Sequence, residues 1–264
     1  MKLPAGQLVV DDVKQFPTNF VRNDYTSSAQ EIVETYGVPR YQEANPALFT
    51  TVTFPFLFGV MFGDIAHGFI LFVFGLFLVF RNHQIENSIL KMLLPHRYLF
   101  AMMGFFSTYC GFIYNEFLSI SLNLFGSCYN MDVETGQKIE RISTECIYPV
   151  GLDPVWYVSD NYLNYTNTLK MKIAVIIGVV HMTAGVFIKA SNAIYFKKWI
   201  DFFFEFIPQI LFMVLLFGYM DFLIIFKWNT DWGFDNSHAP SIITTMINMP
   251  LKMGQTVIIV FSLG

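Results

Sequence analysis

The chain has 264 residues, of which 54% are hydrophobic and only 14% are charged, against roughly 25% charged residues in ordinary soluble domains. Thirty phenylalanines and thirteen methionines are more than one soluble core of this size can hold, and long apolar stretches recur along the chain. The composition therefore predicts an all-α fold, a polytopic transmembrane helical bundle. The net charge of −4 gives no basis for binding nucleic acid.

Residues 1–47 are mixed and polar and carry no signal-peptide pattern, so we expect them to be the end of a cytosolic N-terminal region. Within them, Ser27 and Ser28 predict the start of a short helix that Gly37 ends. The rest, 48–264, is predicted to be a partial membrane domain, because the last apolar segment stops at the end of the chain. Its predicted spans are about 48–63, 66–80, 99–125, 169–188, 207–226 and 255–264, with polar loops at 127–168 and 227–253.

Basic residues are concentrated in the two short connectors, 81–98 and 189–206, which each hold three of them in 18 positions. The polar loops 127–168 and 227–253 hold only two each, although both loops are longer. Because the Lys and Arg of short loops favour the cytosolic side, the connectors are predicted to be cytosolic and the loops lumenal.

With a cytosolic N-terminus, this arrangement requires the apolar run 48–80 to cross the membrane and return. A single helix over this run would be about 50 Å long, too long for a hydrocarbon core of roughly 30 Å. The bundle is therefore predicted to begin with a short helical hairpin, whose arms, 48–63 and 66–80, are somewhat short for the bilayer. Asp64 and His67, the only ionisable residues of this run, then lie at the lumenal tip.

The loop 127–168 contains two of the three cysteines, Cys128 and Cys146, so a disulfide between them is possible if the loop is lumenal. Asn164 begins an Asn-Tyr-Thr tripeptide and is a glycosylation candidate. No cysteine and histidine spacing typical of a metal site occurs, so neither a metal nor a cofactor is predicted.

Ionisable groups within the spans are candidates for function, because a charge at membrane depth costs roughly 2.5–3.5 kcal/mol on insertion scales. Asp64 and His67 are one helical turn apart and can pair, either in a polar site near a lumenal exit or in a hydrogen-bonded turn. His181 is central in its run and either bonds across helices or relays protons. Lys172 is close enough to the boundary to snorkel. The other proton-path candidates, which can equally be carboxylates at the water boundary or solvated helix ends, are Glu116, Asp201, Glu205 and Asp221.

Several collinear blocks carry a specific resemblance: YGVPRYQEANPALFTTVTFPFLFGVMFGDIAHG, RYLFAMMGFFSTYCGFIYNEFLSISLNLFGS, YPVGLDPVW, LKMKIAVIIGVVHMTAGVF and YFKKWIDFFFEFIPQILFMVLLFGYMDFLIIFKW. With these blocks the chain resembles the subunit a family of the V-type proton-pumping ATPases over most of residues 16–228. One departure is Ala66, where members of the family more often have glycine.

The resemblance implies a stator subunit in the membrane sector of a rotary pump, with its first two membrane helices forming a short hairpin. It implies partners: the proteolipid ring, other membrane-sector subunits, and the peripheral stalk and catalytic sector through a missing N-terminal domain. It implies a vacuolar, lysosomal or endosomal type of membrane. No Arg lies within an apolar span, so the family's essential arginine has no counterpart here.

The sequence contains no phosphate-binding glycine loop and no nucleophile elbow, so no catalytic residue is predicted and ATP hydrolysis would belong to partner subunits. Two alternatives stay open. One is a secondary transporter or channel that works alone, which inverted repeats with broken helices would favour. The other is a purely structural anchor segment of the pump.

Overall fold

The computed structural model describes residues 18–81, 87–130, 142–143, 146–159, 161–230 and 241–251. Within these residues the regular structure is helical, apart from an isolated β-bridge between Phe117 and Ile120, which confirms the all-α fold class. The chain divides into two compact units between Ala174 and Val175. Among the described helices, two are long and apolar enough to cross a membrane, Tyr162–Tyr195 and Trp199–Asn229.

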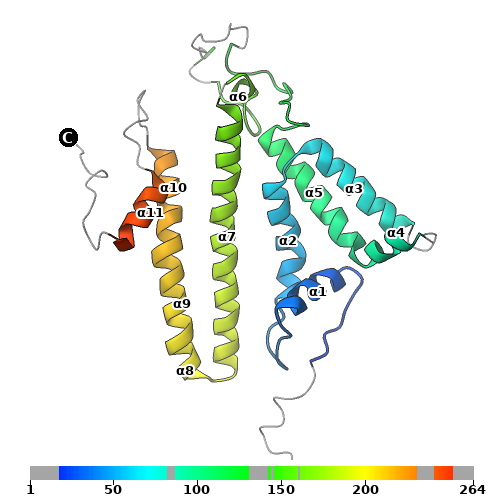
Figure 1. The fold of residues 1–264 in the computed structure, drawn as a ribbon, viewed down its shortest axis with the longest axis vertical. Coiled ribbons are helices and arrows are strands. Elements are labelled where there is room, and N and C mark those ends of the chain that lie inside the picture. The colour runs from blue at the N-terminus through cyan, green and yellow to red at the C-terminus, as the bar shows by residue number, and fades with distance from the viewer. Residues whose placement is uncertain are drawn as a thin grey trace, which may run out of the picture. The chain divides into compact units, whose positions relative to one another are not determined.

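The first unit is built around three apolar helices: α2 (Ala47–Met61), α3 (Ile65–Phe80) and α5 (Arg97–Tyr114). The hydropathy of run 48–80 is continuous, yet the helix breaks at 62–64, where the hairpin tip was predicted. Both arms make their contacts chiefly with α5, which lies between them in Figure 1. With 15 and 16 residues, the arms are about 22–24 Å long, shorter than a bilayer core of about 30 Å.

In the sequence, the spacing of Gly104, Ser107 and Gly111 favours close packing of helices. In the structure, small residues do let α3 and α5 approach closely and run antiparallel. A Cβ atom added at Gly75 of α3 would lie 2.5 Å from the backbone nitrogen of Ala101, and one at Gly104 would overlap the backbone of Phe72. Ser107 is fully buried and donates a hydrogen bond of 2.8 Å to the carbonyl oxygen of Phe62. Backbone contact of this kind is typical of helices packed in membranes.

The second apolar run is helical over a shorter stretch than the predicted span 99–125. Helix α5 ends at Tyr114 because Asn115 adopts a left-handed conformation, with φ 53° and ψ 46°. The amide of Glu116 then donates to the carbonyl of Gly111 and that of Asn115 to Phe112, the pattern of a Schellman cap. Residues 115–125 lie outside the helix although six of them are apolar, so hydropathy alone overestimated its length.

Helix α7 (Tyr162–Tyr195) extends beyond the predicted span 169–188 at both ends, into the predicted loop and into the basic connector. It continues from the first unit into the second, where it is followed by a turn at Lys197. The next helix covers Trp199–Asn229 and contains two π-helical turns, Phe202–Phe206 and Met213–Gly218, between the α-helical segments α8 (Trp199–Asp201), α9 (Ile207–Phe212) and α10 (Tyr219–Asn229).

Four shorter α-helices and one 3-10 helix complete the described structure: α1 (Ser27–Tyr36), α4 (Ser88–Leu93), α6 (Val155–Val158), α11 (Ile242–Leu251) and the 3-10 helix η3 (Leu94–His96). Helix α11 lies within the stretch predicted as the loop 227–253. The predicted span 255–264 lies outside the described residues.

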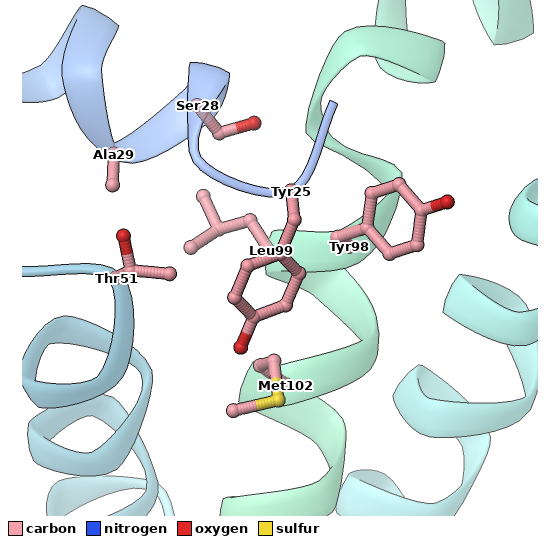
Figure 2. Close-up of a pocket in the computed structure, with 7 residues that line it drawn as sticks. All are labelled: Tyr25, Ser28, Ala29, Thr51, Tyr98, Leu99 and Met102. Atoms are coloured by element: carbon pink, nitrogen blue, oxygen red, sulfur yellow. The ribbon is translucent and has the colours of Figure 1, made fainter. Parts of the chain in front are cut away.

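Helix α1 is fastened to the start of α5 by polar contacts. The Arg97 guanidinium lies 2.6 Å from an Asp24 carboxylate oxygen, and Ser28 donates 2.9 Å to the carbonyl of Pro95. Figure 2 shows the pocket beneath α1, with Tyr25, Tyr98 and Leu99 among its lining residues. The pocket has space for little more than a water molecule and is a packing gap rather than a ligand site.

A disulfide joins Cys128 to Cys146, with their Cα atoms 5.6 Å apart, while Cys110 is buried on α5 and free. We therefore expect one cysteine to react when the denatured chain is treated with a maleimide without reductant, and three to react after reduction. Mass spectrometry of the labelled chain measures the difference. A denatured, unreduced chain that takes up three maleimides would show that the disulfide is absent, and Cys128→Ser is the control that frees Cys146.

Candidate functional site

The candidate site lies where the hairpin tip meets the end of α5 in the first unit, and Asp64 is its first member. Asp64 has an extended conformation and caps α3, since its side chain accepts a 3.1 Å hydrogen bond from the amide of Ala66. Aspartate is favoured at this position because its oxygen satisfies an amide that has no partner within the helix. The other carboxylate oxygen is paired with Nδ1 of His67. The side chain of His67 is 55% exposed, whereas that of Asp64 is 13% exposed.

A tight turn supplies a further donor to Asp64. Phe117 and Ile120 exchange two backbone hydrogen bonds of 2.8 and 2.9 Å, and the two residues between them, Leu118 and Ser119, have φ of 50° and 64°. Such positive values are uncommon for residues other than glycine and asparagine, so this turn stores strain. The amide of Leu118 donates 3.1 Å to Oδ1 of Asp64.

These contacts determine the charge state of Asp64, which lies between the two arms of the hairpin. Burial raises the pKa of its carboxyl group, but the hydrogen bonds from His67, Leu118 and Ala66 lower the pKa by more, so that it lies below its ordinary value. Asp64 is therefore a carboxylate near neutral pH, and in this state it holds the hairpin tip to the turn after α5.

Glu116 connects this tip to α7. Its carbonyl oxygen accepts a 3.0 Å hydrogen bond from the amide of Ile65, and its carboxylate forms an ion pair with Lys170 of α7. The two side chains are only 18% and 12% exposed. The Lys170 ammonium also lies 5.1 Å from the ring centroid of Tyr114, whose hydroxyl donates 2.8 Å to the carbonyl of Val60. A partly buried cation is thus stabilised both by a carboxylate and by the face of an aromatic ring.

Lys170 was missed in the sequence, which directed attention to Lys172, two positions further along. A basic residue at the start of an apolar run was the available signal, but its partner is 54 positions away and no local pattern indicates the pairing. The structure therefore brings three of the predicted residues together, Asp64, His67 and Glu116, and adds Lys170.

The other ionisable residues predicted from the sequence do not belong to the cluster at the hairpin tip. His181, Asp201, Glu205 and Asp221 are in the second unit. Glu205 and Asp201 are about half exposed and lie 2.5 Å from Lys189 and 3.9 Å from Lys198, respectively. One carboxylate oxygen of Asp221, on α10, is buried and has no hydrogen-bond partner.

The glycosylation candidate Asn164 is exposed in the first turn of α7. The hydroxyl group of Thr166, from the same tripeptide, is buried and donates to the carbonyl of Tyr162. In the part of the chain that the structure describes, no group of three His, Cys, Asp or Glu side chains could hold a metal ion. The cluster at the hairpin tip can instead exchange protons and hold charge, since it combines two carboxylates, an imidazole and an ammonium group.

Comparison with known proteins agrees with this picture. The sequence profile described as the V-type ATPase 116kDa subunit family matches residues 4–261. The chain is 43% identical over 258 residues to the vacuolar proton translocating ATPase 100 kDa subunit of Dictyostelium discoideum. The aligned region covers 94% of this chain and 32% of that protein. It is 40% identical over 255 residues to the V-type proton ATPase 116 kDa subunit a 1 of Mus musculus, with 88% and 30% covered.

A plant relative, the V-type proton ATPase subunit a3 of Arabidopsis thaliana, is 43% identical over 231 residues, with 84% of this chain and 28% of that protein covered. The chain thus spans about a third of the length of the curated relatives that it matches. The long apolar helices and these relatives together identify a membrane protein. From the profile match over nearly its whole length, the chain belongs to the V-type ATPase 116 kDa subunit family.

Proposed function

We propose that this chain is part of the stator subunit a in the membrane sector of a V-type rotary ATPase and contributes to ATP-driven proton translocation and organelle acidification. The names of the relatives, which describe proton-translocating ATPase subunits, support the reaction. The family membership does not favour a transporter or channel that works alone. ATP hydrolysis belongs, in this proposal, to partner subunits.

The observation that carries the proposal is the polar cluster at the hairpin tip. Burying the Glu116–Lys170 pair among apolar helices is costly, and an apolar pair of similar size would serve packing at least as well. Asp64 and His67 add groups that bind and release protons beside it. Because packing does not explain why four such groups lie together, we infer that their charges serve the function of the protein. We propose that they line the lumenal end of the proton path.

The proposal includes a topology. The chain crosses the membrane several times, with the connectors 81–98 and 189–206 on the cytosolic side and the loops 127–168 and 227–253 in the lumen. The disulfide between Cys128 and Cys146 supports a lumenal loop, because disulfides persist in oxidising compartments. The membrane is of the vacuolar, lysosomal or endosomal type. The partners are the proteolipid ring, other membrane-sector subunits, the peripheral stalk and the catalytic sector.

The proposal also assigns roles to the predicted residues that lie outside the cluster. Asp201 and Glu205, at the start of the helix Trp199–Asn229, would line cytosolic access to the path. His181 and Asp221 are intramembrane groups that could bind protons, and Asn164 would be glycosylated in the lumen.

The test uses the assembled complex in membrane vesicles, with the variants Asp64→Asn, Glu116→Gln and His181→Gln made singly. We expect ATP-driven proton uptake to fall by on the order of tenfold in Glu116→Gln while the complex still assembles. Glu34→Gln on α1 is the control, since it removes a carboxylate charge from an ion pair outside the cluster. If uptake and assembly survive all three changes, the role in proton movement is wrong. If assembly alone is lost, the segment is a structural anchor.

A further inference from the structure

Asn115 is a polar residue at the end of α5 that the proposed path does not use. It is only 4% exposed. Its side chain nevertheless has partners on both sides: Nδ2 donates 3.1 Å to the carbonyl of Leu152, and Oδ1 accepts 3.2 Å from the amide of Leu122. Because both partners are backbone groups of irregular segments, Asn115 satisfies hydrogen bonds that no helix or sheet provides there.

These two bonds fasten two stretches of the loop to the end of the helix. The amide of Leu152 also donates 3.1 Å to the carbonyl of Ile113, one of the last residues of α5. Gly151 has φ 73°, and any side chain there would overlap that same carbonyl. The segment at 151–152 is therefore packed directly against the helix end, with Asn115 as its side-chain contact.

The backbone of Asn115 sets the direction of the next residue, Glu116. With Asn115 in the left-handed conformation, the Glu116 amide turns back to Gly111. The Glu116 carbonyl accepts from Ile65 and its carboxylate meets Lys170. Asparagine is one of the few residues that adopt this conformation readily, and here its amide group also makes the two bonds to the loop.

We propose that Asn115 is a positioning residue, which holds Glu116 in register with Lys170 by combining a left-handed backbone with two side-chain bonds to the loop. This inference rests on the proposed function for its consequence in proton movement, but the positioning itself concerns the Glu116–Lys170 pair. No single common substitution keeps all of its features. Glycine keeps the backbone conformation and loses both side-chain bonds, while aspartate keeps the acceptor for Leu122 and loses the donor to Leu152.

The first experiment measures the pair directly. The detergent-solubilised complex is treated with a water-soluble amine-acetylating reagent, and acetylation of Lys170 is quantified by mass spectrometry, with the exposed Lys91 as the reference for reagent dose. In Asn115→Gly we expect the acetylation rate of Lys170 to rise on the order of tenfold and to approach the rate in Glu116→Gln. In Asn115→Asp, which keeps one of the two side-chain bonds, the rate should rise less. Ser127→Ala removes another side-chain bond of the same loop, to Asp153, and should leave the rate unchanged.

The second experiment measures the pH profile of ATP-driven proton uptake in vesicles. Asn115→Gly should change the profile in the same direction as Glu116→Gln, whereas Ser127→Ala should at most lower the amount of complex. The inference is overturned if Lys170 acetylation rises in Glu116→Gln but not in either Asn115 variant. If instead Glu116→Gln pumps normally while the Asn115 variants expose Lys170, the positioning role stands and the proposed function fails.

Discussion

Replacing Lys170 by methionine is expected to destabilise the first unit by about 3 kcal/mol, the lower end of the range for breaking a buried ion pair. The change leaves the Glu116 carboxylate, whose side chain is 18% exposed, without its partner and removes the cation from the face of Tyr114. Because both side chains keep some access to water, solvent screens part of the cost of leaving Glu116 unpaired, and the lower end of the range applies. Thermal unfolding of the purified protein in detergent measures the loss, as a lower Tm.

The double variant Lys170→Met with Glu116→Leu separates pairing from packing. Because an apolar pair avoids the desolvation cost, we expect it to recover most of the stability lost in Lys170→Met, although proton uptake should remain low. Arg22→Met breaks a more exposed pair with Glu34 and should cost no more than about 1 kcal/mol. A cost for Lys170→Met as small as that for Arg22→Met would contradict a buried pair.

Gly75→Ala is expected to destabilise the same unit by about 1–3 kcal/mol. The substitution adds only one methyl group, but it adds it where two helices are in backbone contact. The added Cβ would lie 2.5 Å from the backbone nitrogen of Ala101 and 3.0 Å from its Cβ, so α3 and α5 must move apart. That movement loses packing along the whole antiparallel contact. A lower Tm in detergent, with faster proteolysis of the connector between α3 and α5, is the expected result.

Glycines of another helix provide the matched controls. Gly178 and Gly185 are on α7, and a Cβ at either would meet no atom within 4 Å. Alanine there should leave stability unchanged or raise it by up to about 1 kcal/mol, the difference in helix propensity between the two residues. The predicted sign is therefore opposite for the same substitution on two helices. A Gly75→Ala protein as stable as Gly178→Ala would show that the two helices are not held in backbone contact.

The hairpin could be predicted from the sequence because its determinants are local or additive. The length of run 48–80 exceeds one bilayer crossing, and the basic residues of two connectors favour the same side of the membrane for both. Gly104 and Gly111 similarly indicated close helix packing, since small residues seven positions apart lie on one helix face. Each of these conclusions needs only spacing and residue type.

Two features escaped prediction because they depend on tertiary contacts. The end of α5 is set by the left-handed conformation of Asn115, which its bonds to Leu122 and Leu152 support, while apolar residues recur beyond it as far as Phe125. The pairing of Glu116 with Lys170 joins positions 54 apart. A sequence pattern can indicate that a charged residue needs a partner, but it does not identify the partner.

The π-helical turn Met213–Gly218 has a consequence for natural variation in this helix. A π-helical turn holds one residue more than an α-helical turn needs, so the loss of one residue there would convert it to regular α-helix without breaking the chain of hydrogen bonds. The amide that now bonds across the wide turn would keep the same carbonyl partner, so everything beyond it, including Asp221, would stay on its present side of the helix. A deletion in a regular α-helical stretch would turn everything beyond it by about 100°, whereas one in this turn would leave the helix intact and its buried carboxylate on the same side.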